Sequence, residues 1–506
     1  MQISKSDYML FLRHPAWLWL KKHDKTKLPP IDEDTQAFFD AGFVFESFAE
    51  QLFPDSVKIE SDRNNHQPYN YQSYKDLTPK TAYQIKSGAK TIIQGRFEAG
   101  NITCICDVIV KIDDKTFDLY EIKSSTQAKP EHEYDLAFQA EVIERNNYKV
   151  RNIYVIHVNN EFIRNGEVDA KKLTKITEVT ENVKKLKDFT EKNILKALEI
   201  IKLKECPDIS PAHSSLGAFG DWLSIYKTMA DIDEYSIYHL CSPGADKIGE
   251  LEALGIKKIS DIPDNFILND KQSKQVHATK HNKVLINIPK IKSFLDQLKF
   301  PLYFLDYETL SSVVPYFDGL GPYKQLPFQY SLHVIDKPNG KLKHFEYLHS
   351  NNSNPVKPLT ESLKSQIGNE GTILVWFEGF EKSCNELMGT IMPEYQKFYK
   401  SLNNRIIDLM TPFSTGAYVH KDFFGSASIK KVLPVLIPEL SYKNLDIHAG
   451  GAAQRLWMDA VLYGKRDAEK DKILNDLIKY CGLDTLAMVK IYEFLVKKTE
   501  KYHKSL

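Results

Sequence analysis

The sequence predicts a mixed α/β protein that is built from more than one domain. The chain has 506 residues, which is more than one hydrophobic core usually serves. Hydrophobic residues make up 42% and aromatic residues 11% of the chain, which is enough to build packed cores and argues against disorder. In both halves, segments with the alternating apolar pattern of strands stand beside segments with the apolar spacing of helices.

Charge and cysteine content restrict the compartment and the partners. The formal net charge is zero, so a nucleic-acid surface would have to come from the lysine-rich segments 170–204 and 271–292, although such helix faces are usually only solvated. The six cysteines are scattered and form no C-x-x-C pair, which predicts a reducing compartment without disulfides. Because no secretory signal or membrane-length apolar window is visible, we expect a cytoplasmic protein with no membrane partner.

Residues 1–205 are predicted to form the first α/β domain. We expect an aromatic-rich helix over 1–22 and a second helix over 34–53, where apolar residues recur at helical spacing up to Pro54. Alternating apolar patterns predict strands, and helical spacing predicts a helix between the last two of them. The strands are expected at 91–98, 102–112, 116–123 and 151–159, and the helix at 135–148.

Residues 206–290 are predicted to be a helical linker. Turn-forming residues dominate its start, and 250–263 is expected to form two short helices around a Gly-Ile turn. We expect a small core there of Leu251, Leu254, Ile256 and Ile259. This shape resembles a helix-hairpin-helix, an element that holds a DNA backbone through turn amides and helix N-termini. A plain pair of linker helices explains the same residues equally well.

Residues 291–506 are predicted to form the second α/β domain. Apolar segments predict strands, and a long apolar-periodic segment near the end of the chain predicts a helix. The strands are expected at 301–310, 327–335 and 345–349, a strand that runs into a helix at 371–380, a short buried segment at 405–410, and the long helix at 467–497.

An acidic pair and a lysine in the first domain form a candidate metal site. The strands at 102–112 and 116–123 read as a hairpin that turns near 113–115, so Asp107 is expected directly opposite Glu121. Glu121 and Lys123 share a face of their strand. Facing acids repel each other unless a divalent cation binds both, and a neighbouring lysine can orient water or neutralise a phosphate. The alternative interpretation is an exposed hairpin that merely carries charges.

These residues resemble the core of the PD-(D/E)XK nuclease family in its RecB-type branch. The resemblance covers roughly 5–205 and implies a restriction-endonuclease-like fold in which Asp107, Glu121 and Glu46 bind the metal. It also implies catalytic roles for Lys123 and Gln139, with Glu121 serving both purposes.

One feature of many RecB-type relatives, a four-cysteine iron–sulfur site, is expected to be absent. Its early cysteine would fall at His14-Pro15, and Cys206 and Cys241 alone cannot supply four thiolates. We expect aromatic packing to replace the cluster, from Trp17, Trp19, Phe219 and Trp222.

A second acidic set lies in the second domain. Asp306 and Glu308 are expected on one face of an apolar strand, where such a pair is unfavourable without a cation. Tyr480 and Asp484 are spaced i, i+4 on the late helix and share a face. Acids of this kind can hold two metals for phosphodiester cleavage, with the tyrosine positioning water. The alternative is a set of chance acids in an α/β core.

This set resembles the tyrosine-bearing subtype of the DnaQ-like 3′–5′ exonuclease family. Asp306 and Glu308 match its first motif, and Tyr480 and Asp484 its last. The middle motif, usually Phe-Asp, is matched by Phe-Glu with Glu381 as the acid. The resemblance implies an RNase H-like α/β fold, metal ligation by the four acids, a catalytic Tyr480 and a secondary contribution from Asp408.

The arrangement of both domains resembles a bacterial family that fuses a RecB-type nuclease to a DnaQ-like exonuclease, and 428–454 resembles a stretch peculiar to it. This implies a Mg²⁺- or Mn²⁺-dependent nuclease with two centres, acting in DNA repair, processing or defence, with DNA expected rather than RNA. Because no Walker-type loop is present, a helicase would be a separate partner protein. Two alternatives stay open: a nucleic-acid-binding scaffold with degenerate centres, and an RNA-trimming exonuclease.

Overall fold

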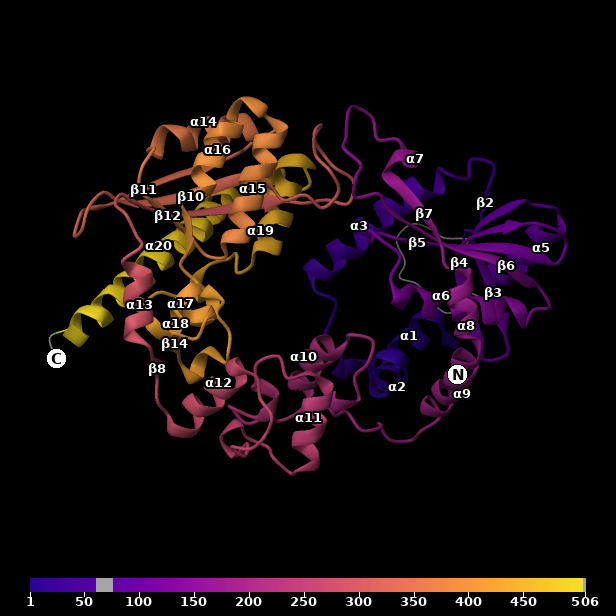
Figure 1. The fold of residues 1–506 in the computed structure, drawn as a ribbon. Helices are drawn as coiled ribbons and strands as arrows, with labels where there is room; N and C mark the ends of the chain where they lie inside the picture. Colours follow the sequence, from indigo (N-terminus) through magenta and orange to yellow (C-terminus); the bar gives the residue numbers. More distant parts are fainter. Residues whose placement is uncertain (61–75, 504–506) are drawn as a thin grey trace. The chain divides into compact units, whose positions relative to one another are not determined.

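The computed structural model describes residues 1–60 and 76–503, which fold into two compact units (Figure 1). Each unit contains its own sheet together with helices, and this confirms the mixed α/β class. The first unit comprises Met1–Ile232, Gly244–Glu250 and Val313–Pro322, and the second comprises Asp233–Pro243, Leu251–Ser312 and Tyr323–Leu506. The segment 206–290 therefore contributes residues to both units.

A seven-stranded sheet forms the centre of the first unit. Its order is β2-β3-β4-β5-β6-β7, and β1 pairs with the start of β4. β3, β4 and β5 are antiparallel neighbours, whereas β6 runs parallel to β5 and antiparallel to β7. The strands are β1 (Ile3–Ser4), β2 (Val57–Lys58), β3 (Thr91–Ala99), β4 (Ile102–Lys111), β5 (Thr116–Lys123), β6 (Lys149–Val158) and β7 (Thr174–Glu178).

Helices cover both faces of this sheet, because successive strand residues point to opposite sides. Ile92 packs in one buried cluster with Tyr8 of α1, while its neighbour Ile93 packs on the other face with Phe45 of α3. The first face also carries α6 and α9. The helices are α1 (Lys5–Arg13), α2 (Pro15–His23), α3 (Glu33–Glu50), α5 (Leu77–Lys86), α6 (Pro130–Glu144), α7 (Ala170–Leu173), α8 (Thr180–Lys185), α9 (Lys187–Ile200) and α10 (Phe219–Met229).

The second unit contains a five-stranded sheet of order β11-β10-β9-β12-β13. β10 is antiparallel to both of its neighbours, and β12 is parallel to β9 and β13. β8 and β14 form a separate antiparallel pair. The strands are β8 (Leu285–Ile286), β9 (Leu302–Leu310), β10 (Leu326–Ile335), β11 (Leu342–Leu348), β12 (Thr372–Val375), β13 (Ile406–Asp408) and β14 (Tyr418–Val419).

A 34-residue helix, α20, packs against β9 and β10 in this unit. The helices that belong to the second unit or end in it are α11 (Gly244–Ala253), α12 (Asp270–His281), α13 (Ile288–Leu295), α14 (Val356–Gln366), α15 (Glu378–Ile391), α16 (Gln396–Asn403), α17 (Thr411–Ser414), α18 (Ile429–Leu436), α19 (Gly450–Trp457) and α20 (Lys470–His503). Across residues 1–60 and 76–503, no helix combines the length and apolarity that crossing a membrane requires.

Two helical predictions need correction. The helix expected over 1–22 is two helices, because His14 leaves the helical conformation and its ring accepts from the amide of Ala16 at the start of α2. The second helix expected within 250–263 is only a single 3₁₀ turn at Ile259–Asp261. Leu254 is 61% exposed, so its assignment to a small core is wrong, whereas Leu251 and Ile259 are fully buried.

Candidate functional site

The hairpin of β4 and β5 places Asp107 beside Glu121. Val108 pairs with Tyr120, so the register is the one expected from the short turn. The amide of Ile122 donates to Oδ2 of Asp107 at 2.8 Å, which fixes this carboxylate against β5. Glu121 is 1% exposed, and it shares its strand face with Lys123.

Two lysines and a glutamine surround the Glu121 carboxylate. Lys5 Nζ of α1 lies 2.8 Å from Oε1 and 3.1 Å from Oε2 of Glu121, and Lys123 Nζ lies 2.7 Å from Oε1. Gln139 Nε2 of α6 donates to Oε2 at 2.7 Å. Asp135, one turn earlier on α6, accepts from Lys123 at 2.9 Å and from Gln139 at 3.2 Å. Three acids and two lysines therefore form one connected group.

Burial and mutual repulsion shift the protonation of this group. Burial raises the pKa of Asp107 and of Glu121, and repulsion between the two raises that of Glu121 further. Burial works against the charged form of Lys5, but Asp107, Glu121 and Asp135 together raise its pKa well above the usual value. Burial also opposes ionisation of Asp135, yet Lys123 and Lys5 hold its pKa below the usual value. The lysines therefore stay charged.

Glu46 stands apart from this group. It lies on α3, and its carboxylate accepts from Gln94 Nε2 at 2.5 Å. Within residues 1–60 and 76–503, no hydrogen bond joins Glu46 to Asp107 or Glu121. Burial and repulsion from Glu50 raise the pKa of Glu46, and Glu46 in turn helps to raise the pKa of Asp107. The structure thus brings Glu121, Lys123 and Gln139 into one hydrogen-bonded group, and Asp107 joins it through an ion pair with Lys5 at 3.8 Å. Glu46 acts on this group through charge.

Aromatic side chains pack around His14, the position at which the RecB-type resemblance would place the first cysteine of an iron–sulfur site. Trp222 is fully buried, and Trp17 and Trp19 pack against its cluster, whereas Phe219 is not part of it. The ring of His14 stacks on Trp222 with centroids 4.1 Å apart, and its Nε2 lies 2.9 Å from the carbonyl oxygen of Ser210. Burial lowers the pKa of His14 to about 4, so this ring is neutral at physiological pH.

A cavity of about 440 Å³ in the second unit is lined by the second acidic set. Asp306 and Glu308 reach it from β9, and Tyr480 and Asp484 reach it from α20, which packs on that strand. Alternation along β9 sends the intervening Tyr307 to the opposite face, where its hydroxyl donates to Asn385 of α15. The other lining residues are Thr309, Gln325, Trp376, Phe380, Ile429, Lys430, Gly450, Gly451, Gln454 and Met488, together with part of Tyr307.

The carboxylates at this cavity repel one another in a buried setting. Burial raises the pKa of Asp306 and of Glu308 well above their usual values, and repulsion within the acidic set adds to the effect. Burial raises the pKa of Asp484 to about 6, although a hydrogen bond from Tyr442 and the charge of Lys430 oppose this. Glu308 is 7% exposed and has no hydrogen-bond or ion-pair partner among the described residues. A cation at this position would relieve the repulsion.

Glu381 and Asp408, the remaining predicted acids, lie outside the cavity lining. Glu381 is 1% exposed, and its Oε2 is buried without a hydrogen-bond partner in the described part of the chain. Burial and repulsion from Asp306 raise the pKa of Glu381 well above its usual value. Asp408 instead accepts from the amides of Phe377, Glu378 and Met410 at 2.9 to 3.3 Å. Asp408 therefore holds the start of α15.

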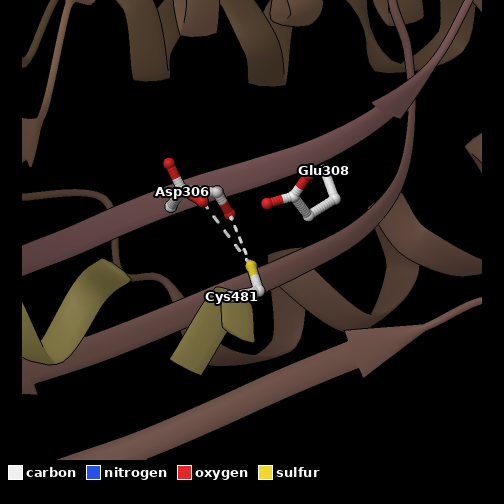
Figure 2. Close-up of side chains that lie close together, drawn as sticks. All are labelled: Asp306, Glu308 and Cys481. Carbon is white, nitrogen blue, oxygen red and sulfur yellow. Dashed lines mark hydrogen bonds between the residues drawn. The ribbon is translucent and has the colours of Figure 1, made fainter. Parts of the chain in front are cut away.

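Sequence reasoning missed four residues of these groups. Lys5 and Asp135 complete the first group, and Lys430 and Cys481 lie at the second. Asp135 carried a signal, because it precedes Gln139 by one helical turn. Lys430 falls within 428–454, a stretch whose resemblance to the fusion family assigned no role to any single residue. Figure 2 shows Cys481 beside Asp306 and Glu308, with its Sγ 3.6 Å from Asp306 Oδ2.

Comparison with known proteins gives one partial family match. Residues 303–428 match the family model described as "Domain of unknown function (DUF2779)". The matched segment includes Asp306, Glu308 and Glu381, and it ends before Tyr480 and Asp484.

The chain is also similar to proteins of Mycoplasma and Ureaplasma species. It is 26% identical over 270 residues to "Uncharacterized protein MG366" of Mycoplasma genitalium, a match that covers 46% of this chain and 40% of that protein. It is 24% identical over 319 residues to "Uncharacterized protein UU173" of Ureaplasma parvum, covering 57% and 44% respectively. The matched stretches thus span less than half the length of these relatives.

Proposed function

We propose that this protein is a divalent-metal-dependent nuclease whose principal centre is the cavity of the second unit. The observation that carries the proposal is the convergence of Asp306, Glu308, Tyr480 and Asp484 on one cavity from two elements distant in the sequence. A protein core tolerates buried like charges poorly, so their concentration at one cavity is typical of a functional site. These are also the residues that the DnaQ-like resemblance implies.

The residues at the cavity fit a divalent cation. Asp306, Glu308 and Asp484 would hold it, since their buried carboxylates face the cavity without a lysine in direct ion-pair contact among the described residues. When bound, such an ion supplies charge neutralisation and Lewis-acid polarisation of a phosphate oxygen.

Tyr480 and Lys430 supply a proton donor and a positive charge. Lys430 Nζ donates to the Tyr480 hydroxyl at 3.1 Å, which leaves the phenolic proton free to point at a phosphate oxygen or a water. Burial and the nearby Asp484 raise the pKa of Tyr480, so the hydroxyl keeps this proton at neutral pH. Tyr480 therefore acts as a hydrogen-bond donor and orienting group rather than as a base. Lys430 adds positive charge where a phosphate would bind.

Aromatic rings beside the acids favour a nucleic acid as the phosphodiester substrate. Trp376 and Phe380 line the same cavity as Asp306 and Glu308. Exposed ring faces next to a phosphate-binding position can stack on bases of a single strand. DNA is the substrate that we propose, with roles in repair, processing or defence.

The first unit has a second candidate function, which is nucleic-acid binding without cleavage. Lys5 already contacts both oxygens of Glu121 and lies 3.8 Å from Asp107 Oδ1. The ammonium of Lys5 therefore offsets the negative charge of the two carboxylates, which a metal ion would offset in an active RecB-type centre. Cleavage at this centre would require Lys5 to give way to the ion.

A cleavage assay with matched variants tests the proposal. The full chain is incubated with labelled single- and double-stranded DNA and with RNA, in Mg²⁺, Mn²⁺ or chelator. Asp306→Asn is expected to lower cleavage by at least about a hundredfold, because the metal loses a ligand. Asp107→Asn reports on the first centre, and Asp296→Asn, at the exposed end of α13, is the control. Unchanged cleavage by the Asp107→Asn, Asp306→Asn double variant would rule out both centres, and cleavage of RNA alone would favour RNA trimming.

A further inference from the structure

The cavity of the second unit carries a sulfur atom among its acids. Cys481 follows Tyr480 on α20 and is fully buried. Its Sγ lies with a carboxylate oxygen of Asp306 and one of Glu308 in a group whose atoms are all within 4.8 Å of one another. In Figure 2 the Sγ points from α20 toward β9, between the two acids.

The spacing of these atoms is compatible with a tetrahedral ion. A tetrahedral ion about 2.3 Å from sulfur and about 2.1 Å from oxygen places the two ligand atoms about 3.6 Å apart, whereas a right-angled octahedral arrangement places them about 3.1 Å apart. The distance between Cys481 Sγ and Asp306 Oδ2 is 3.6 Å. The spacing therefore fits tetrahedral coordination, and it equally fits the hydrogen bond that the thiol donates to this carboxylate.

Glu308 provides an independent sign that a ligand belongs here. Its side chain is 7% exposed, lines the cavity, and has no hydrogen-bond or ion-pair partner among residues 1–60 and 76–503. A buried carboxylate without a partner is costly, and a cation is the ligand that removes this cost. The Asp306–Cys481 contact alone is a hydrogen bond from a thiol to a carboxylate, and it gives Glu308 no partner.

We infer that Cys481 joins Asp306 and Glu308 of the proposed metal-binding set in a three-ligand site for a borderline-soft divalent cation of the zinc class, whose fourth position is left to Asp484 or to a ligand from the cavity. Thiolate sulfur favours Zn²⁺, Co²⁺ or Cd²⁺ over Mg²⁺, and three protein ligands with one open position are typical of catalytic zinc sites. The thiol proton is released to solvent when the ion binds. This inference rests on the proposed function for the role of the ion, and it departs from the Mg²⁺ or Mn²⁺ that the family resemblance implies.

Metal spectroscopy tests the inference without any cleavage assay. The full chain is stripped of metal with chelator and titrated with Co²⁺ and separately with Cd²⁺. We expect a sulfur-to-metal charge-transfer band with each ion, and with Co²⁺ the intense visible bands of a tetrahedral centre. Cys481→Ser is expected to abolish the charge-transfer band and to weaken Cd²⁺ binding by at least about tenfold, with a much smaller effect on Mn²⁺ binding.

Matched variants separate the site from other thiols and from misfolding. Cys384→Ser removes another buried thiol of the same unit, whose Sγ faces the carbonyl of Gln325, and it is expected to keep the band. Asp306→Asn is expected to weaken Co²⁺ binding. Cys481→Ala is the second variant if Cys481→Ser alters the circular dichroism spectrum.

Each outcome decides for or against the thiolate ligand. Co²⁺ binding by the wild type without a charge-transfer band overturns the inference, as does a band that persists in both Cys481 variants or at unchanged affinity in Asp306→Asn. A wild type that binds none of these ions also overturns it. A band that depends on Cys481, together with no cleavage of any nucleic acid under any metal, leaves the site standing and rejects the proposed function instead.

Discussion

Lys5 Nζ lies 2.8 Å from Oε1 of Glu121, although 116 positions separate the two residues in the chain. The same ammonium lies 3.8 Å from Oδ1 of Asp107, so one lysine of α1 offsets the repulsion between the two facing acids of the hairpin. The side chain of Glu121 is 1% exposed, which makes this compensation necessary for the folded unit.

Lys5→Met is therefore expected to destabilise the first unit and to make it sensitive to metal. Removing one partner of a buried ion pair typically costs about 3–5 kcal/mol, because the remaining charge is left uncompensated. Lys123 still contacts Glu121, so the loss should fall toward the lower end of that range. Mn²⁺ should restore most of the lost stability by taking the place of the ammonium. The measurement is the melting temperature in chelator and in Mn²⁺.

Lys22→Met is the matched control for this effect. Lys22 has the same side-chain exposure as Lys5, 21%, and pairs with the buried Asp7 at 2.6 Å. Asp7 keeps Lys21 as a second partner, and no predicted metal ligand faces it. This variant should lose stability without recovery in Mn²⁺. Equal Mn²⁺ responses of the two variants and the wild type would contradict a latent metal site at Asp107 and Glu121.

The pKa of Asp484 predicts how the metal-free second unit responds to pH. Burial raises this pKa from 3.8 to about 6, so the folded state favours the protonated acid. The protonated Asp484 therefore favours the folded state, and this contribution to the free energy of unfolding is fully present below pH 4. It is lost as the pH rises through 6, at a cost on the order of 3 kcal/mol by pH 8. Asp484→Asn removes the charge, so it should raise the melting temperature in chelator at pH 8, and this gain should shrink toward pH 4.

Asp476→Asn on the same helix is the comparison. Asp476 is nearly buried and pairs with Lys472 and Lys479, so its neutralisation removes favourable contacts. It should bring no gain in stability at pH 8. A melting temperature of Asp484→Asn that lies below the wild type at pH 8, or a gain that does not vary with pH, would contradict the cost of burying the Asp484 charge at the cavity.

The strands at the centre of both sheets were predicted because strand patterning is local, whereas β1, β2, β7, β8 and β14 were not predicted. The predicted bounds of β3, β4, β5 and β9 lie within one or two residues of the observed bounds, and the short turn near 113–115 was enough to determine the register of β4 and β5. The break between α1 and α2 was missed, although Pro15 is a residue that commonly begins a helix.

The parts of the two sites that escaped prediction depend on long-range packing. Lys5 contacts Glu121, and Lys430 contacts Tyr480, although the two residues of each pair lie far apart in the sequence. No local sequence pattern predicts such contacts. The carboxylates were visible because acids are rare in apolar strands, whereas a lysine at a helix start has many ordinary explanations. Cys481 was missed for a similar reason, since a cysteine in an apolar helix is usually a core residue.

Asp408 is expected to be a structural residue and not a metal ligand. Its carboxylate caps α15 through the amides of Phe377 and Glu378, and Phe377 adopts a left-handed backbone at φ 84° that needs such support. Asp408→Ala should lower the free energy of unfolding by about 1–2 kcal/mol, as loss of a capping residue does. Its Mn²⁺ affinity, measured by calorimetry, should stay near that of the wild type. A tenfold loss of affinity with unchanged stability would instead assign Asp408 to the metal.

Phe380 is expected to bind a nucleobase at the cavity. Stacking on an aromatic side chain contributes about 1–3 kcal/mol per base, which corresponds to roughly five- to 150-fold in affinity. Phe380→Ala should therefore raise KM for single-stranded DNA within that range while Co²⁺ binding is unchanged, because the acids remain in place. Phe398→Ala on α16, an aromatic residue outside the cavity lining, is the control and should leave KM near the wild-type value. If Phe380→Ala lowers kcat without changing KM, the ring positions the neighbouring Glu381 and does not contact the substrate.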